Sequence, residues 1–279
     1  MKKFENYMLA SDIDSTFIWQ NGYTSPRNLE AVRYFNENGG RFSFASGRNH
    51  LDYRVIIPGD PAKFATMPYV LCNGSFLYDA KTDQILNPHY VDSAAARSVY
   101  LDVRDRFPMV GIRGSFEAGF LVLEEDQYVR DQVASFHGEH LLHIVSREEL
   151  HPDNLFKIVV TYKMPEILDE IGAYLRVAYA DSVTVTRSAP HILEVQPKGI
   201  SKAYQLRYLR EEYRKINPDI RLWCVGDYDN DLEMLEAADV ACCPENATDK
   251  VKSICDHIVC HCKDGAIADI VELMEKEQS

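Results

Sequence analysis

The sequence has few basic residues for its length. It contains 30 lysines and arginines against 43 aspartates and glutamates, which gives a formal net charge of −13. Nucleic-acid backbones are bound through clustered lysine and arginine side chains, so this balance excludes nucleic acid as a routine partner. A local phosphate site is still possible, because main-chain amides, one lysine and a metal ion can converge on a single phosphate group.

Long hydrophobic runs and a disulfide pattern are also missing. No run approaches the roughly 20 apolar residues of a membrane-spanning helix. The apolar stretch near the start is too short for a signal peptide and leads directly into acidic residues. The seven cysteines are odd in number and scattered, which argues against a disulfide framework. The sequence therefore predicts a cytoplasmic protein that does not bind a membrane.

What is present is a globular composition, with 46% hydrophobic and 26% charged residues in a length of 279, which is near two typical domains. The two ends of the chain alternate strand-like and helix-like patterns, which predicts a parallel sheet with crossover helices. The strands expected there are 7–13, 42–44, 69–72, 222–225, 240–243 and 257–260, and the helices begin near residues 26, 202, 232 and 265.

The middle of the chain has a different pattern, in which strands outnumber helices. The helices expected there are 92–107 and 166–177, and the strands are 109–113, 120–123, 156–162 and 182–186. This predicts an α+β insertion with a mainly antiparallel sheet. The expected fold class is therefore α/β, with a Rossmann-like parallel sheet core that has helices on both faces. Residues 1–84 and 190–279 would form this core, and residues 85–189 the inserted domain.

Polar residues follow three of the expected parallel strands. The segments are Asp12-Ile13-Asp14, Ser46-Gly47-Arg48 and Gly226-Asp227-Tyr228-Asp229-Asn230-Asp231. Ligands of open parallel sheets bind beyond the carboxyl ends of the strands, where all three segments fall. Carboxylates gathered at this edge would repel each other unless a cation lay among them, and aspartate oxygens suit Mg²⁺. Each aspartate alone could equally cap a helix, but the joint pattern favours a metal site.

Four segments resemble, in order, the motifs of the haloacid dehalogenase superfamily. They are Asp12-Ile13-Asp14-Ser15-Thr16, Ala45-Ser46-Gly47-Arg48, Lys202 and Gly226-Asp227-x-x-Asn230-Asp231. Shorter features resemble the Cof-type branch: Asn73-Gly74-Ser75, Gly199 to Lys202, Gly226 to Leu235, Asn246-Ala247 and Asp264-Gly265. The resemblance spans nearly the whole core. The insertion resembles the α+β cap domain of this branch, which selects the substrate, only in position, size and texture.

The resemblance implies a Mg²⁺-dependent phosphatase that acts on a small phosphorylated metabolite, such as a sugar phosphate. Asp12 would attack phosphorus and form an aspartyl phosphate. Asp14 would protonate the leaving oxygen and then deprotonate the attacking water. The same two residues would hold Mg²⁺, Asp14 through its main-chain carbonyl, together with Asp227 and Asp231. The cation offsets the repulsion between the carboxylate and the phosphate.

The resemblance also implies a set of phosphate-binding groups. The Ser46 hydroxyl and the Gly47 amide would cradle the phosphate, and Asn230 would contact it. Lys202 would stabilise its charge from the amino end of a helix that Ser201 is expected to cap. Each of these residues alone has an ordinary interpretation as a turn or a solvated side chain.

One residue departs from the pattern of the branch. Ser15 occupies the position after the second aspartate, where the branch usually has glycine. If this position needs a positive backbone φ, serine is mildly strained there.

A dense group of possible zinc ligands lies near the end of the chain. It consists of Cys255, His257, Cys260, His261 and Cys262. Zinc sites generally use paired ligands with regular spacing, and no second pair lies at a suitable distance in the sequence. A strand with alternating side chains explains part of this group equally well, so no zinc site is predicted.

Two other functions stay open at this point. A sugar phosphomutase of the same superfamily would share the core and the cap. A non-catalytic small-molecule-binding protein could keep the fold, although the retention of Asp12, Asp14, Lys202 and the acidic fourth motif argues against it.

Overall fold

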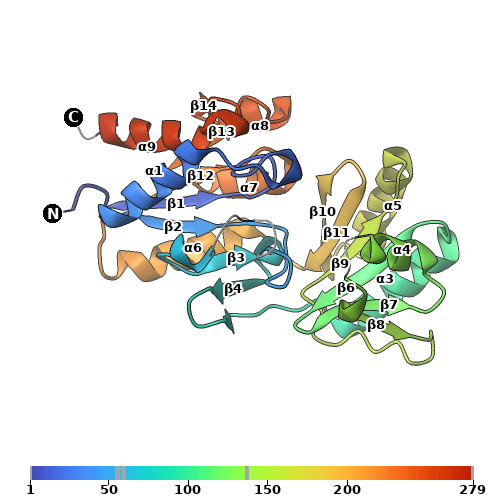
Figure 1. Cartoon of the computed structure of the whole chain (residues 1–279). Coiled ribbons are helices and arrows are strands. Elements are labelled where there is room, and N and C mark those ends of the chain that lie inside the picture. Colours follow the sequence, from blue (N-terminus) through green and yellow to red (C-terminus); the bar gives the residue numbers. More distant parts are fainter. Residues whose placement is uncertain (1, 54–56, 58–60, 136–137, 278–279) are drawn as a thin grey trace. The chain divides into compact units, whose positions relative to one another are not determined.

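The chain divides into two compact units. The computed structural model describes residues 2–53, 57, 61–135 and 138–277 (Figure 1). The core unit comprises Met1–Asn87 and Ser201–Ser279, and the inserted unit comprises Pro88–Ile200. The boundaries therefore lie at 87 and 200, whereas the sequence placed them at 84 and 189. The difference at the second boundary has a clear cause, because the strand that follows residue 190 pairs within the inserted unit.

The core unit is built on a five-stranded sheet in which every neighbouring pair is parallel. Its strands, in spatial order, are β14 (His257–Val259), β13 (Val240–Pro244), β12 (Arg221–Val225), β1 (Tyr7–Ser11) and β2 (Arg41–Phe44). The central strand β1 is buried along its full length, as expected for a parallel sheet covered on both faces.

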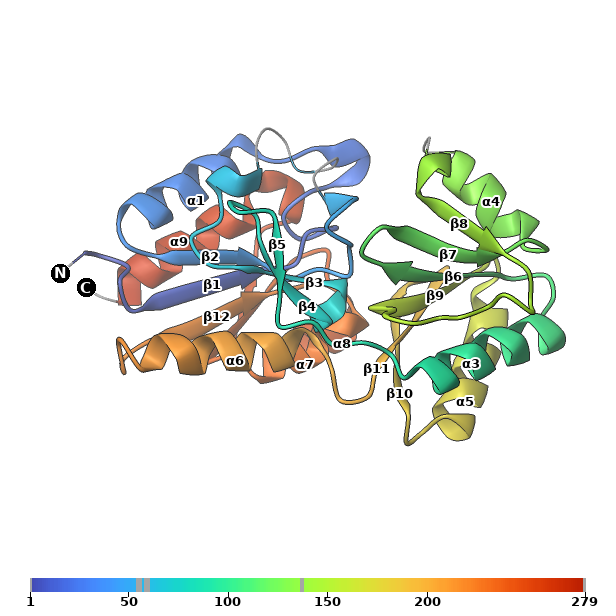
Figure 2. The same cartoon turned by 90° about the horizontal axis from the view of Figure 1, so that it is seen from below.

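Helices cover both faces of this sheet, which confirms the predicted α/β architecture. The helices α1 (Pro26–Glu37) and α9 (Ala266–Glu277) pack together on one face, and α6 (Lys202–Arg214) and α7 (Leu232–Glu236) lie on the other (Figure 2). Pro26 starts α1 because its fixed φ suits the first helical position. Val32 and Phe35 are one turn apart and are both buried. Among the described residues, neither Ser25 nor Ser201 accepts a capping hydrogen bond through its hydroxyl, so the expected Ser201 side-chain cap is wrong.

A small antiparallel sheet lies beside β2. It contains β3 (Tyr69–Leu71), β4 (Phe76–Asp79) and β5 (Gln84–Leu86). The expected strand at 69–72 is therefore paired with β4 and meets the parallel sheet through an isolated bridge between Ala45 and Val70. The shorter helical segments among the described residues are α8 (Asp249–Lys252), η1 (Gln20–Gly22), η2 (Pro61–Lys63), η3 (Cys72–Gly74), η4 (Glu139–Leu141), η5 (Asp229–Asp231) and η6 (Cys262–Asp264).

The inserted unit has a six-stranded sheet that is antiparallel except for its β7–β8 pair. The strands, in spatial order, are β10 (Val183–Ala189), β11 (Ile192–Pro197), β9 (Lys157–Thr161), β6 (Gly111–Phe116), β7 (Gly119–Leu123) and β8 (Leu142–Val145). The helices are α3 (Ser93–Arg106), α4 (Gln127–Ala134) and α5 (Pro165–Ala178). The sequence analysis missed β8, β11 and α4.

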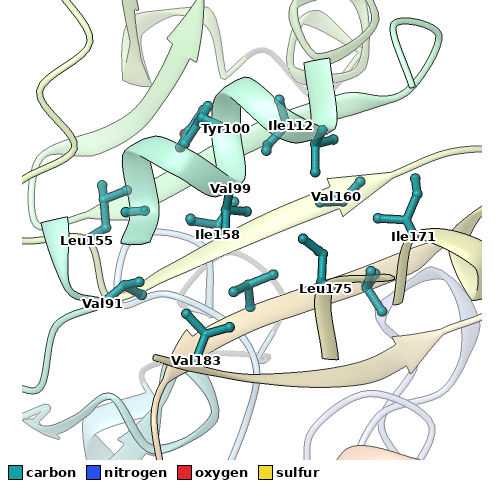
Figure 3. Close-up of a cluster of buried hydrophobic side chains, with 14 of the residues drawn as sticks. Val91, Val99, Tyr100, Ile112, Leu155, Ile158, Val160, Ile171, Leu175 and Val183 are labelled. Carbon is teal, nitrogen blue, oxygen red and sulfur yellow. The ribbon is translucent and has the colours of Figure 1, made fainter. Parts of the chain in front are cut away.

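The hydrophobic core of the inserted unit lies between α3, α5 and one face of this sheet (Figure 3). Ile158 and Val160 are two residues apart on β9, so their side chains point to the same face of the sheet. There they meet Val99 of α3 and Leu175 of α5. None of the helices within the described residues combines the length and the apolar character that crossing a bilayer requires.

Candidate active site

The aspartate that follows β1 is placed by the register of the parallel sheet. Ser11 pairs with Val225, and the amide of Asp12 donates a hydrogen bond of 2.9 Å to the carbonyl of Val225. The strands β1 and β12 therefore end at the same level. Because parallel neighbours end at one edge, the residues that follow them, Asp12 and Asp227, come close together.

Three carboxylates gather at this edge. Asp12, Asp227 and Asp231 each offer an oxygen atom, and these atoms lie within 4.8 Å of one another. The Nζ atom of Lys202 lies 2.6 Å from Asp12 Oδ1 and 2.6 Å from Asp231 Oδ1. The Lys202 side chain is fully buried. The first residue of α6 therefore supplies the cation for acids that follow two different strands.

Asp231 is fixed from two directions. Its Oδ2 atom accepts hydrogen bonds from the amides of Asp227 (3.0 Å) and Tyr228 (3.2 Å). Gly226 makes this turn possible, because a Cβ atom at that position would lie 2.4 Å from Asp231 Cγ. The spacing of the Gly-Asp-x-x-Asn-Asp segment thus reflects a tight turn in which the last aspartate folds back on the first.

The charges in this group do not balance, since one lysine faces three carboxylates. Burial raises the pKa of the Asp12 carboxyl well above its usual value, Lys202 opposes the shift, and Asp231 and Asp227 add to it. Burial also raises the pKa of Asp227 to about 7, again with a contribution from Asp231. The pKa of Lys202 is raised: burial disfavours its charged form, but Asp12 and Asp231 more than offset this effect.

These residues fit a hard divalent cation. Their donor atoms are carboxylate oxygens, which Mg²⁺ prefers, and the excess negative charge favours a cation. Within the described parts of the chain, no other group of three or more histidine, cysteine, aspartate or glutamate side chains is close enough to hold a metal ion, and the segment from Cys255 to Cys262 supplies no ligand to this one.

Asp14 lies beside this group and not in it. Its side chain is 51% exposed, and its carboxylate forms an ion pair with Arg48. Arg48 Nε lies 2.8 Å from Asp14 Oδ2, and Arg48 Nη2 lies 2.7 Å from Asp14 Oδ1. The sequence analysis gave Arg48 no role. Its place directly after Ser46 and Gly47, at a strand end opposite an acid, is the signal that could have identified it.

The other predicted phosphate-binding residues lie on neighbouring loops. Ser46 is buried, and its hydroxyl oxygen accepts a hydrogen bond of 3.2 Å from the amide of Arg48. The Asn230 side chain donates a hydrogen bond of 3.1 Å to Asn73 Oδ1, which links the fourth motif to the turn after β3. Gly47 follows Ser46 in the same loop. A contact with phosphate stays a prediction for Ser46, Gly47, Lys202 and Asn230.

The turn that contains Asp14 has the strained residue that the sequence suggested. Ser15 has a φ of +59°, so a non-glycine residue occupies the left-handed region. The hydroxyl of the next residue, Thr16, donates a hydrogen bond of 3.0 Å to Asp227 Oδ1. This contact was not predicted, and it joins the turn to the acidic group.

Comparison with known proteins gives a consistent result. The model of a family described as haloacid dehalogenase-like hydrolases matches residues 9–271. The 5-amino-6-(5-phospho-D-ribitylamino)uracil phosphatase YitU of Bacillus subtilis is 27% identical over 261 residues, which cover 89% of this chain and 90% of that protein. The phosphatase YwpJ of the same organism is 25% identical over 282 residues, which cover 90% and 93%.

Solved structures show the same fold. A haloacid dehalogenase-like hydrolase from Bacteroides thetaiotaomicron superposes with a TM-score of 0.76 and 21% identity, covering 96% of this chain and 98% of that one. Another from B. subtilis superposes with a TM-score of 0.79 and 19% identity, covering 95% and 98%.

Proposed function

The chain belongs to the haloacid dehalogenase-like hydrolase family, and on this premise we propose that it is a Mg²⁺-dependent phosphatase that uses Asp12 as its nucleophile. The observation that carries the proposal is the group formed by Asp12, Asp227 and Asp231 around the buried ammonium of Lys202. Relatives over most of the chain are named phosphatases, which supports the same reaction class.

Asp12 suits the role of nucleophile because of its fixed position. The Asp12 amide is bonded to β12 and its Oδ1 to Lys202, so its carboxylate has little freedom. Attack of this carboxylate on phosphorus forms an aspartyl phosphate and releases the alcohol, and water then cleaves the aspartyl phosphate. Lys202 would neutralise charge on the phosphoryl oxygens during both steps.

A metal ion would be held by Asp12, Asp227, Asp231 and the main-chain carbonyl of Asp14. Mg²⁺ bound there would offset the repulsion between the anionic nucleophile and the anionic phosphate. The three carboxylates supply the negative charge that such a cation needs.

Asp14 suits the role of general acid and base. Its carboxylate is half-exposed, and so it is accessible to a leaving group and to water, whereas Asp12 is buried. Asp14 would give its proton to the leaving oxygen and then take one from the attacking water. Ser46, Gly47 and Asn230 would bind the phosphate oxygens from the adjoining loops.

The substrate is a small phosphorylated metabolite in this proposal, and the inserted unit selects it. The chain leaves the core unit after Asn87 and returns at Ser201, directly before Lys202. The residue at which the chain returns is thus the direct neighbour in sequence of Lys202, which contacts Asp12 and Asp231. We favour hydrolysis over phosphoryl transfer within a sugar, because the relatives described above are named phosphatases.

The experiment is a comparison of the wild-type chain with Asp12→Asn. Release of inorganic phosphate from p-nitrophenyl phosphate would be measured with Mg²⁺ and with EDTA, and folding would be checked by circular dichroism. We expect turnover only for the wild type with Mg²⁺. Equal turnover by a folded Asp12→Asn protein would refute the nucleophile.

A panel of hexose phosphates and 5-amino-6-(5-phospho-D-ribitylamino)uracil would then define the substrate, and conversion of one hexose phosphate into another without phosphate release would indicate a mutase.

A further inference from the structure

The turn after β1 contains a residue in a strained backbone conformation. Ser15 adopts a φ of +59°, a region in which the Cβ atom of an L-residue other than glycine is crowded. Such a conformation persists when the surroundings hold it in place. Ser15 lies between Asp14 and Thr16, so a relaxation of its φ would displace the carboxylate of one and the hydroxyl of the other.

The Asn246 carboxamide supplies a contact at this point. Its Nδ2 atom donates a hydrogen bond of 2.8 Å to the carbonyl of Ser15. Its Oδ1 atom accepts a hydrogen bond of 3.0 Å from the amide of Cys262. These residues follow the strands β13, β1 and β14, so one side chain joins three loops at the same edge of the core sheet.

The segment that begins at Asn246 also contacts the acidic group. The amide of Thr248 donates a hydrogen bond of 3.0 Å to the carbonyl of Asp227. Thr16 donates to the carboxylate of the same aspartate. The peptide bond between Ser15 and Thr16 is thus held at its carbonyl by Asn246, while the next side chain is held by Asp227.

We propose that Asn246 is a positioning residue for the reaction. Its carboxamide holds the Ser15 carbonyl so that the turn keeps its left-handed conformation, with Asp14 and Thr16 in their observed places. The role needs a donor toward Ser15 and an acceptor toward Cys262, which an asparagine provides and an aspartate does not. This inference rests on the proposed roles of Asp12 and Asp14.

The test combines changes at residues 246 and 15. Asn246→Asp keeps the acceptor for the Cys262 amide but replaces the donor toward Ser15 by an oxygen, and Asn246→Ala removes both bonds. Each would be made in the wild type and in a Ser15→Gly background, in which glycine adopts a positive φ without strain. The measured quantities are kcat and KM for a phosphate monoester with saturating Mg²⁺.

We expect both Asn246 variants to lower kcat on the order of 10- to 100-fold in the wild-type background, because small displacements of reacting groups have effects of this size. KM should change less. In the Ser15→Gly background the loss should shrink to about a third or less of that factor, because the turn no longer depends on the carboxamide. Equal losses in the two backgrounds would overturn the proposal.

Asn36→Ala is the matched control. Asn36 is also half-buried and also bridges two partners. Its Nδ2 atom donates a hydrogen bond of 3.0 Å to the carbonyl of Phe64, and its Oδ1 atom accepts a hydrogen bond of 3.2 Å from the hydroxyl of Thr66. It lies near the start of β2, away from the acidic edge. Asn36→Ala should lower the unfolding temperature and leave kcat unchanged. A loss of kcat as large as that of Asn246→Ala would overturn the proposal.

A readout without turnover separates this inference from the proposed function. If the wild type releases no phosphate from any substrate, the proposed function fails, and the contact is tested by unfolding alone. Asn246→Ala should then lower the unfolding temperature less in the Ser15→Gly background than in the wild type. Additive changes in the unfolding temperature would show that Asn246 does not hold the turn.

Discussion

Arg48 and Asp14 form a two-point ion pair at the carboxyl edge of the core sheet. The guanidinium nitrogens Nε and Nη2 lie 2.8 Å and 2.7 Å from the two carboxylate oxygens. A planar guanidinium bound through two nitrogens fixes the plane of a carboxylate as well as its distance. The orientation of the proposed acid is therefore set by the loop after β2, and not by its own loop alone.

This pair leads to a prediction about leaving groups. Arg48→Met should lower kcat for a hexose 6-phosphate by about tenfold or more, since the alkoxide leaving group needs a well-placed proton. The loss with p-nitrophenyl phosphate should be several times smaller, because p-nitrophenolate leaves without protonation. Arg48→Lys, which keeps the charge without the two-point geometry, should be intermediate. A general disturbance of the fold would instead lower kcat for both substrates by the same factor.

A second prediction separates the two half-reactions. Asp14→Asn should lower steady-state turnover by far more than tenfold, because asparagine can neither donate a proton to the leaving oxygen nor accept one from water. With p-nitrophenyl phosphate the first half-reaction should still proceed, so rapid mixing should show a burst of p-nitrophenolate that does not exceed one equivalent per protein. A loss below about tenfold would count against the acid and base role.

A third prediction concerns the buried lysine. Lys202→Met should lower the free energy of unfolding by about 3 kcal/mol in EDTA, since it leaves two buried carboxylates without their cation. Mg²⁺ should recover part of this loss. Lys157→Met is the control, because Lys157 forms a buried ion pair with Glu194 in the inserted unit. Urea denaturation should show a loss for Lys157→Met that Mg²⁺ does not recover. An equal response of the two variants to Mg²⁺ would contradict the metal site.

A fourth prediction follows from the raised pKa of Asp227. The metal-free folded protein holds a proton on Asp227 up to about pH 7, whereas the usual pKa of the group is 3.8. The folded state therefore binds more protons between these values, and this group makes stability fall as pH rises. At pH 8 in EDTA, Asp227→Asn should unfold about 2–4 °C above the wild type, since it removes one of three mutually repelling charges.

The same comparison has two internal controls. Near pH 5 the wild-type Asp227 is protonated, so the two proteins should unfold at similar temperatures. At pH 8 with Mg²⁺ the order of the unfolding temperatures should reverse, because bound Mg²⁺ stabilises the wild type and the variant binds the ion only weakly. A variant that is less stable than the wild type at pH 8 without metal would show that the carboxylates do not repel each other as described.

The sequence carried most of the information about the core sheet. Buried strands with polar residues directly after them predicted that Asp12 and Asp227 share one edge, and the register of β1 with β12 places them there. Lys202 contacts Asp12 although it is 190 residues from it in the sequence, and the sequence analysis assigned both residues to one site. That placement came from the family motifs, since nothing in the local pattern distinguishes a buried lysine at a helix start from a solvated one.

The inserted unit was predicted less well. The strand β11 was not predicted, and its residues were counted with the core from residue 190 onward, yet it pairs with β9 and β10. The hairpin formed by β4 and β5 was also missed, as its strands are short and β5 is largely exposed.

The order of the residues specifies the chemical groups that are available: an acid after β1, a second acid two residues later, an acidic turn after β12, and a serine where glycine is usual. Which of these groups contact each other follows from the folded chain alone. It pairs Asp14 with Arg48, joins Ser15 to Asn246 and leaves one lysine among three carboxylates. Periodicity is a local property of a chain. The partner of a side chain depends instead on the order of the strands in the sheet, which brings loops that are far apart in the sequence to one edge.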